Sequence, residues 1–495
     1  MKEALPWLLF TYVLAPLALF GLLAQLRSAP AADPGAGSGA DPGAGPAPDE
    51  LPELALVALV LPPLLLPWLA ILLYALAPQR DPRFYLWGAA LLGALAVFPT
   101  PRRLRCGQRA LILGWGWLRS LDPARGGLLL LALGALGVLL ALQLAGAAVF
   151  GVVHGSDDAL QYAQLARLIF ERGEVSFYLF SAADPQSGYF SPMTHPLGFP
   201  ATFLWGYLIQ GHADVVGVGK LVFAWTPCVT ALGLVVALRR RSALAQLAAP
   251  VLLLGTTYYR HTLQAYSVDP LLGLTVLTLV ISLGRAAARP SRIWLALSGV
   301  SLGLCLIVHS LGLLALPMAL VTWVGLRRRD PWRTLAWRTL ALALLALLIG
   351  GQQYAENTVE RGRPIGDSNP IWELEEIAAE EHFVQTRGLA TPRQRVLAYL
   401  QVWSRPDRFG PAPWLGLLGV VLLLRRREEH DAGRPAACFL ALYFAGVFLL
   451  TFPLGGNQIV RNPRYFVFTL PLFALCGAVA LESCEAWAAR PKAST

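Results

Sequence analysis

The chain has 495 residues, of which 56% are hydrophobic and 14% charged, with a mean hydropathy of +0.55. A soluble protein of this length needs a charged surface over several domains, so the composition excludes that class and is typical of a membrane protein. The net charge of +10 does not indicate nucleic-acid binding, because the arginines stand in short clusters beside apolar stretches. Such clusters set membrane topology.

We predict an all-α, polytopic integral membrane protein with about thirteen transmembrane helices, since about 20 apolar residues cross a bilayer. The first apolar stretch is long for a signal peptide, so we expect it to remain as a helix. A flexible linker of Gly, Pro, Ala and Asp follows at 29–48. The predicted spans are 7–26, 54–77, 84–99, 126–150, 214–238, 243–258, 267–284, 293–309, 311–326, 339–353, 413–424, 436–453 and 465–487.

Arginine clusters on alternate crossings predict one cytoplasmic face, because arginine resists translocation. They are Arg239–Arg241, Arg285 with Arg289 and Arg292, Arg327–Arg329, Arg425–Arg427, and the tail with Arg490 and Lys492. Two long polar loops, 151–213 and 354–412, are then extracytoplasmic. We divide the chain into N-terminal membrane helices at 1–125, a membrane domain at 126–487 that holds both outer loops, and a cytoplasmic tail at 488–495. The side of the N-terminus stays open, because three spans place Met1 outside whereas Lys2 favours the inside.

The first outer loop opens with an acidic pair, Asp157 and Asp158, followed by the pattern of an amphipathic interfacial helix. Either Ser156 or Asp157 could simply cap that helix. A cap explains one carboxylate but not two, so the alternative is that one aspartate is a general base while the other orients it or binds a cation.

The same loop ends with Gly188-Tyr189-Phe190-Ser191-Pro192-Met193-Thr194-His195-Pro196-Leu197-Gly198-Phe199-Pro200 before it re-enters the membrane. Its prolines predict that this stretch is not a simple helix. Tyr189 could stack on a sugar ring or belong to the aromatic belt at the interface. We include Tyr189 and His195 in a candidate substrate loop.

Taken in order, these motifs resemble the GT-C glycosyltransferase superfamily, in particular its protein O-mannosyltransferase-like and polyprenyl-phosphate-sugar-dependent branches. The resemblance also rests on Tyr258-Tyr259-Arg260-His261, on Ala265-Tyr266-Ser267-Val268-Asp269-Pro270, and on Arg464-Tyr465 at the start of the last span. It covers residues 126–487, and it implies that this membrane domain is the catalytic domain. It departs from the family in lacking a Trp-Trp-Asp signature and a large soluble C-terminal domain, and in the helices before residue 126.

The resemblance implies an inverting transfer of a sugar from a polyprenyl-phosphate carrier to a glycan, lipid or protein acceptor, on the outer face of a bacterial cytoplasmic membrane. It also implies that a carboxylate of the acidic loop is the general base and that basic residues contact the lipid phosphate. This phosphate is the leaving group, and it needs neutralisation of its charge but no general acid. The candidates for phosphate contact are Arg260, His261, Arg461, Arg464 and Tyr465, and His309 is a further site candidate. No cofactor is firmly implied, and a divalent cation, if one takes part, would bind Asp157 or Asp158.

Each candidate also has a simpler interpretation. An outer arginine could contact lipid headgroups, His309 could be structural, and Asp269 before Pro270 is predicted to be an N-cap. The mixed charges of 354–412 predict a solvated helix face, and this segment could alternatively shape the acceptor groove. A lipid-linked sugar flippase or secondary transporter is the alternative function, although no internal repeat is seen. A noncatalytic partner in envelope polysaccharide assembly is a third.

Overall fold

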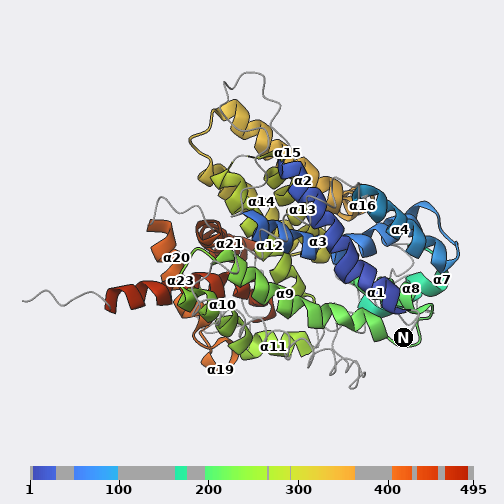
Figure 1. Cartoon of the computed structure of the whole chain (residues 1–495), viewed down its shortest axis with the longest axis horizontal. Helices are drawn as coiled ribbons and strands as arrows, with labels where there is room; N and C mark the ends of the chain where they lie inside the picture. The colour runs from blue at the N-terminus through green and yellow to red at the C-terminus, as the bar shows by residue number, and fades with distance from the viewer. Residues whose placement is uncertain are drawn as a thin grey trace, which may run out of the picture.

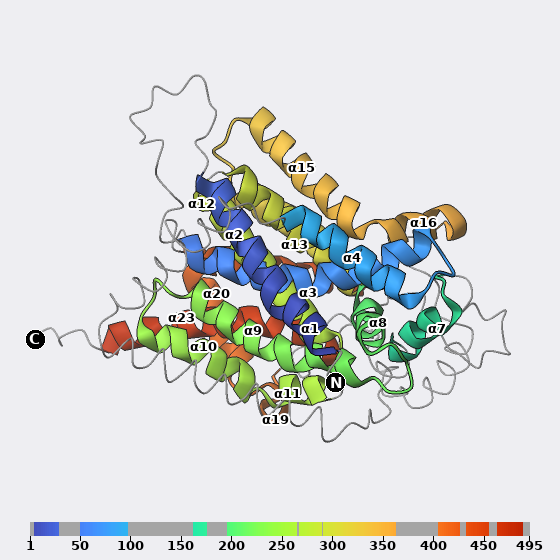
Figure 2. The same ribbon diagram turned by 45° about the vertical axis from the view of Figure 1, so that its right-hand side comes forward.

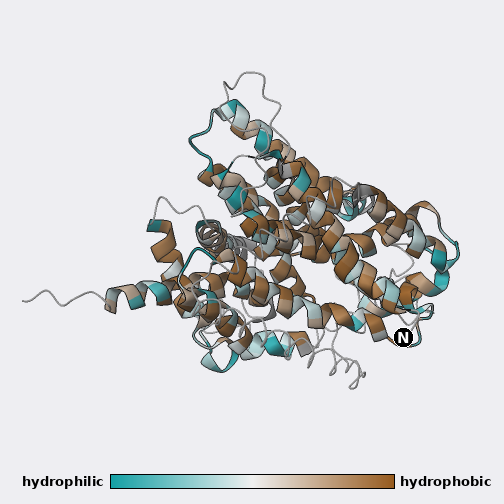
Figure 3. Cartoon of the chain, viewed as in Figure 1, coloured by the Kyte–Doolittle hydropathy of each residue, from teal (hydrophilic) through white to brown (hydrophobic). Residues whose placement is uncertain are grey.

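The computed structural model describes residues 4–28, 50–97, 162–175, 196–264, 267–289, 291–362, 404–425, 432–454 and 463–488. Throughout these ranges the regular structure is helical, with no strand. This confirms the predicted all-α membrane fold. Hydrophobic residues make up most of the length of the helices, and hydrophilic ones gather at helix ends and on short peripheral helices (Figure 3).

The helix bounds follow the hydropathy of the sequence closely. The helices are α1 (Ala4–Leu9), η1 (Phe10–Leu14), α2 (Ala15–Ser28), α3 (Leu51–Leu76), α4 (Pro82–Val97), α7 (Gln164–Arg172), α8 (Gly198–Gln210), η5 (Gly217–Lys220), α9 (Leu221–Ala237), α10 (Ala243–Gly255), α11 (Thr257–Gln264), α12 (Asp269–Ala288), α13 (Arg292–Val308), α14 (Gly312–Leu326), α15 (Trp332–Gly350), α16 (Gln352–Arg361), α19 (Pro406–Phe409), α20 (Ala412–Arg425), α21 (Gly433–Leu454), η7 (Pro463–Thr469) and α23 (Leu470–Ala488).

Six helical stretches within the described ranges are long and apolar enough to cross a membrane: Ala4–Leu26, Leu51–Leu76, Gly217–Ala237, Asp269–Ala288, Trp332–Gly350 and Phe466–Ala488. Four shorter apolar helices, α10, α13, α14 and α20, accompany them. The predicted span 126–150 and the proposed boundary at residue 125 lie outside the described residues. The predicted total of thirteen spans therefore stays a prediction.

The arginine clusters gather at one end of the helix bundle, which distinguishes its two ends. The predicted cytoplasmic clusters follow the ends of α9, α12, α14 and α20, and we call this the arginine end. The starts of α12 and α23 and the turn between α13 and α14 belong to the opposite end. In Figure 2, α7, α8 and α16 lie on the right, far from the end of α23 on the left.

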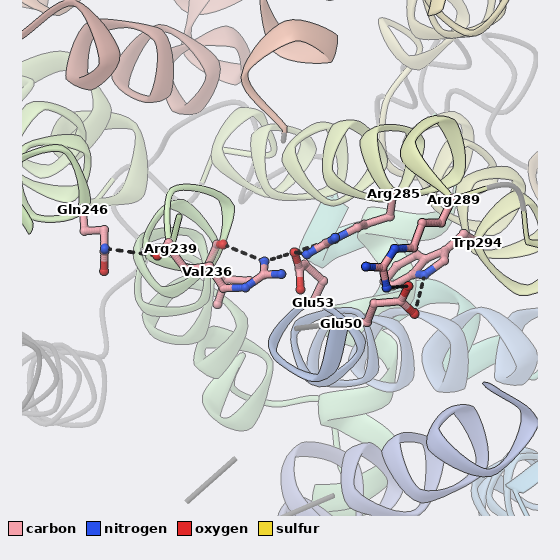
Figure 4. A network of polar contacts seen from close by, with 8 residues as sticks. All are labelled: Glu50, Glu53, Val236, Arg239, Gln246, Arg285, Arg289 and Trp294. Carbon is pink, nitrogen blue, oxygen red and sulfur yellow. Dashed lines mark hydrogen bonds and ion pairs between the residues drawn. The ribbon is translucent and has the colours of Figure 1, made fainter. Parts of the chain in front are cut away.

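Helix α3 is held at the arginine end by ion pairs of two buried glutamates, Glu50 and Glu53 (Figure 4). Glu53 Oε1 accepts from Arg285 Nε at 2.7 Å and Nη2 at 2.5 Å, and also pairs with Arg239. Glu50 Oε1 lies 3.3 Å from Arg289 Nη1. The acids stand at the start of α3 and the arginines near the ends of α9 and α12, an arrangement that the helix dipoles also favour.

These pairs show how the N-terminal helices run. Helix α3 starts at the arginine end, and α2 packs along it with its own end on the same side in Figure 2. The start of α1 is near the opposite end, where Trp7 packs edge-on against Trp87 with ring centroids 4.6 Å apart. Thr11 Oγ1 accepts from Trp205 Nε1 of α8 at 3.0 Å. This arrangement favours the open alternative with Met1 on the side opposite the arginine clusters.

The first outer loop contains two helices within its described part. The predicted amphipathic helix is present as α7, with Leu165, Ala166 and Ile169 buried. In the proline-containing re-entry, residues 196–197 are not helical and α8 begins at Gly198, whereas 188–195 lie outside the described residues. Pro196 precedes this helix and Pro200 stands in its first turn, where a missing N–H costs no hydrogen bond.

Cysteine labelling provides a test of the predicted sidedness. In a background without the native cysteines, Asp214→Cys and Asp407→Cys should react with an impermeant maleimide on intact cells. Arg240→Cys and Arg328→Cys should react only after permeabilisation, because arginine-rich loops stay in the cytoplasm. Labelling of either arginine position from outside would reverse the topology.

Candidate functional site

Three short segments meet at the opposite end of the bundle: α11, α19 and η7. Helix α11 packs against both of the others and against the start of α12. In Figures 1 and 2, α11 and α19 lie together at the lower edge of the molecule. Two predicted phosphate-binding groups therefore share one region, since Arg260 and His261 are on α11 and Arg464 and Tyr465 are on η7. We call these three segments the basic cluster.

Helix α11 is amphipathic, and this positions its basic residues. Tyr259, Thr262 and Leu263 are buried at the spacing of one helix face. Arg260 and His261 are exposed on the other face. The chain therefore presents a guanidinium and an imidazole outward from a helix anchored by its apolar side.

Arg408 joins this cluster, although the mixed charges around it predicted a solvated helix face. Its guanidinium carbon lies 5.9 Å from the ring centroid of Tyr258 on α11, within cation–π range. Phe409 is buried, and its ring centroid is 5.6 Å from that of Tyr258. The signal in the sequence was the short Arg-Pro-Asp-Arg-Phe-Gly segment directly before an apolar helix.

Among the residues that the structure describes, the charges beside α19 are only partly balanced. Arg405 Nη2 lies 2.9 Å from Asp407 Oδ2, and this hydrogen bond lowers the pKa of the exposed Asp407 carboxyl. Asp407 thus remains ionised and is engaged by Arg405. Arg260 and Arg408 add positive charge to the same region, which suits a bound anion at the level of the lipid headgroups.

Asp269 differs from its predicted role as an N-cap. Val268 is the cap residue of α12 and Asp269 is its first helical residue, fully buried beside α11 and η7. Its Oδ2 accepts from Ser267 Oγ at 2.5 Å. The carboxylate stands at the positive end of the α12 dipole, which stabilises it there.

His309 lies at the opposite end, as predicted from the sequence. It is buried at the end of α13, and its Nδ1 accepts from the backbone N–H of Leu311 at 3.0 Å. This contact shapes the turn into α14. The Nδ1 nitrogen of His309 therefore has a structural role.

The re-entry of the first loop is fixed beside His309. Gln353 Oε1 of α16 accepts from the buried backbone N–H of Leu197 at 3.1 Å. A Cβ on Gly198 would come within 2.3 Å of the Ile307 carbonyl oxygen, so only glycine permits this approach. The start of α8, the end of α13 and the start of α16 therefore meet, and the two predicted outer loops leave the bundle side by side.

The remaining predicted site residues are Asp157, Asp158, Tyr189, His195 and Arg461, and all lie outside the described residues. For Arg464 and Tyr465 the structure describes the backbone, as part of η7, and not the side chains. Within the described ranges, no three His, Cys, Asp or Glu side chains are grouped to hold a metal ion. The cation predicted for the acidic pair is therefore untested.

Comparisons with known proteins give one structural likeness. No protein-family model matches the chain, and no curated protein matches it. A crystal structure of ArnT from Cupriavidus metallidurans bound to undecaprenyl phosphate is similar, with 17% sequence identity and a TM-score of 0.46. The match covers 72% of this chain and 62% of that protein, so less than two thirds of ArnT is spanned. At this level the likeness carries no argument about substrates.

Proposed function

We propose that this chain is an inverting membrane glycosyltransferase that transfers a sugar from a polyprenyl-phosphate carrier at the end opposite the arginine clusters. The observation that carries the proposal is the basic cluster, in which segments far apart in sequence gather arginines around one region. A phosphate leaving group needs its developing charge neutralised there. Arg260, His261, Arg408 and Arg464 supply that charge in the proposal.

The reaction requires a base as well as the basic cluster. One carboxylate of Asp157 or Asp158 removes the proton from an acceptor hydroxyl, and that oxygen attacks the anomeric carbon. The bond from this carbon to the phosphate oxygen breaks, and the carrier leaves as polyprenyl phosphate. A single displacement inverts the configuration. The sugar and the acceptor, whether glycan, lipid or protein, are left open.

A flippase or secondary transporter is the alternative. Carriers place charged residues near the middle of the membrane, on the substrate path. Within the described helices, the buried charged side chains Glu50, Glu53, Lys220, Asp269 and Arg285 all lie at or near helix ends. This distribution favours an enzyme whose polar chemistry is at the membrane surface.

Binding of polyprenyl phosphate to the purified protein tests the phosphate site. Arg408→Ala and Arg464→Ala should each weaken binding roughly 10- to 100-fold, since a charge-assisted hydrogen bond contributes about 1.5–3 kcal/mol. Arg464→Lys should retain only part of the wild-type affinity for polyprenyl phosphate, because lysine lacks the planar fork of arginine. The measurement is native mass spectrometry or a thermal-shift titration in detergent.

A matched control is Arg328→Ala, which removes one arginine from the arginine end. It should leave the affinity for polyprenyl phosphate unchanged. Equal losses in Arg328→Ala and Arg464→Ala would mean that the lipid responds only to net positive charge. Unchanged affinity in both Arg408→Ala and Arg464→Ala would reject the basic cluster as the phosphate site.

A further inference from the structure

Helix α7 ends on a contact with the N-terminal helices. Gly173 caps α7 in the left-handed conformation, with φ +73°, and its N–H bonds to the Ile169 carbonyl at 2.9 Å. Its own carbonyl accepts from the backbone N–H of Gln79 at 2.6 Å. Gln79 belongs to the turn between α3 and α4, so segments 94 positions apart are joined by their backbones.

Tyr85 organises that turn. It is fully buried on α4, and its hydroxyl donates to the Ala77 carbonyl at 2.8 Å and accepts from the Arg80 N–H at 2.9 Å. The same hydroxyl is 3.4 Å from the Gly173 carbonyl oxygen. The Tyr85 ring stacks on Tyr74 of α3, with an interplanar angle of 13°.

The turn stores backbone strain at the point of contact. Gln79 has φ +59°, a left-handed conformation that disfavours residues with a Cβ and that persists only where surrounding contacts impose it. The Tyr85 hydrogen bonds on either side of Gln79 impose it here. As a result, the Gln79 N–H points at the cap of α7.

The position of α7 matters because of what precedes it in the chain. Its first residue, Gln164, comes six positions after Asp158, the second carboxylate of the acidic pair. The Tyr207 hydroxyl of α8 donates to the Ala163 carbonyl at 3.3 Å, which holds the start of α7 as the turn holds its end. In the sequence, the acidic pair therefore stands a few residues before a helix that is held at both ends.

We propose that Tyr85 is a positioning residue for the acidic pair: through the Gln79–Gly173 contact it fixes α7 and hence the base. This inference rests on the proposed glycosyl transfer. It gives the turn between α3 and α4 a role in positioning the acidic pair. The ion pairs of Glu50 and Glu53 fix the far end of α3, so this helix spans from the arginine end to the cap of α7.

Two tyrosine variants test the proposal as a matched pair. Tyr85→Phe keeps the stacked ring but loses the hydroxyl, and Tyr74→Phe does the same on the partner ring. The Tyr74 hydroxyl is buried and has no hydrogen-bond partner among the described residues. Tyr85→Phe should lower kcat about 10-fold with little change in the donor KM, since small misplacements of reacting groups are costly. Tyr74→Phe should keep the wild-type kcat.

A distance measurement reads the position of α7 without using activity. Spin labels at Arg83→Cys and Glu171→Cys, in a background without native cysteines, should give one narrow distance distribution in wild type and in Tyr74→Phe. Tyr85→Phe should broaden or shift it. Gly173→Ala should do the same, because its Cβ would lie 3.2 Å from Gln79 Cα in a left-handed conformation.

The outcomes separate this inference from the proposed function. Wild-type kcat and an unchanged distance in Tyr85→Phe would overturn the positioning role, and so would equal losses in both tyrosine variants. A wild-type protein that transfers no sugar from any lipid-linked donor would instead reject the proposed function. In that case the spin-label distance measurement still decides whether Tyr85 positions α7.

Discussion

Glu53→Ala is expected to lower the unfolding free energy by about 3–5 kcal/mol, because it leaves buried arginines without their counter-ion. The Glu53 side chain is 4% exposed, and those of Arg239 and Arg285 are 7% and 6% exposed. Both guanidinium groups meet the same carboxylate oxygen, Oε1 (Figure 4). Removing it leaves two positive charges facing each other with little access to water.

The measurement is the apparent melting temperature in detergent, with the yield of monodisperse protein as a second readout. Glu53→Gln separates charge from shape, and it should lose most of the same stability because an amide cannot balance the arginines. Glu485→Ala is the matched control, since this glutamate is exposed near the end of α23. A melting temperature of Glu53→Ala equal to that of Glu485→Ala would show that the buried pairs contribute nothing net.

The acidic partners of the arginine clusters illustrate what the sequence could not reveal. The clusters were readable as topology signals because each arginine is costly inside a bilayer. Glu50 and Glu53 pair with arginines on helices that begin more than 150 residues later, and no local pattern encodes such a pairing. Two glutamates at the start of an apolar span were nonetheless a usable signal, because buried acids require partners.

Helix bounds were predictable where apolar residues ran without interruption. The span predicted at 293–309 is α13 at Arg292–Val308, and that at 311–326 is α14 at Gly312–Leu326. The span predicted to begin at residue 339 is α15, which begins earlier in the chain, at Trp332. The prediction placed the start incorrectly because arginines interrupt the first turns of this helix. It missed α8, whose 13 residues are shorter than a span and follow a proline-rich segment.

The candidate site was predictable in its residue types but not in its assembly. Arg260 and Arg464 could be chosen because cations on the predicted outer side suit a phosphate. That α11 and η7 are in contact depends on helix packing over 200 residues of sequence. Arg408 was overlooked because a mixed charge run resembles a solvated surface, whereas the buried Phe409 beside it anchors the segment against α11.

Asp157→Asn or Asp158→Asn is expected to lower sugar transfer by about 10²- to 10⁴-fold, the contribution of a positioned general base. Asparagine keeps the shape and caps a helix as well as aspartate does, so a pure capping role predicts normal turnover in both variants. Alanine removes both the charge and the cap, and comparison of Asn with Ala at each position separates the two roles.

Each of the four variants should be assayed for expression, melting temperature and sugar transfer on the same preparation. The lipid-linked donor for this assay is the intermediate that accumulates when the gene is deleted, identified by mass spectrometry. The catalytic role requires at least one Asn variant that is folded, binds polyprenyl phosphate with wild-type affinity and is nearly inactive. Normal turnover in both Asn variants would make the carboxylates structural, and the noncatalytic assembly partner would then explain the chain better than a transferase.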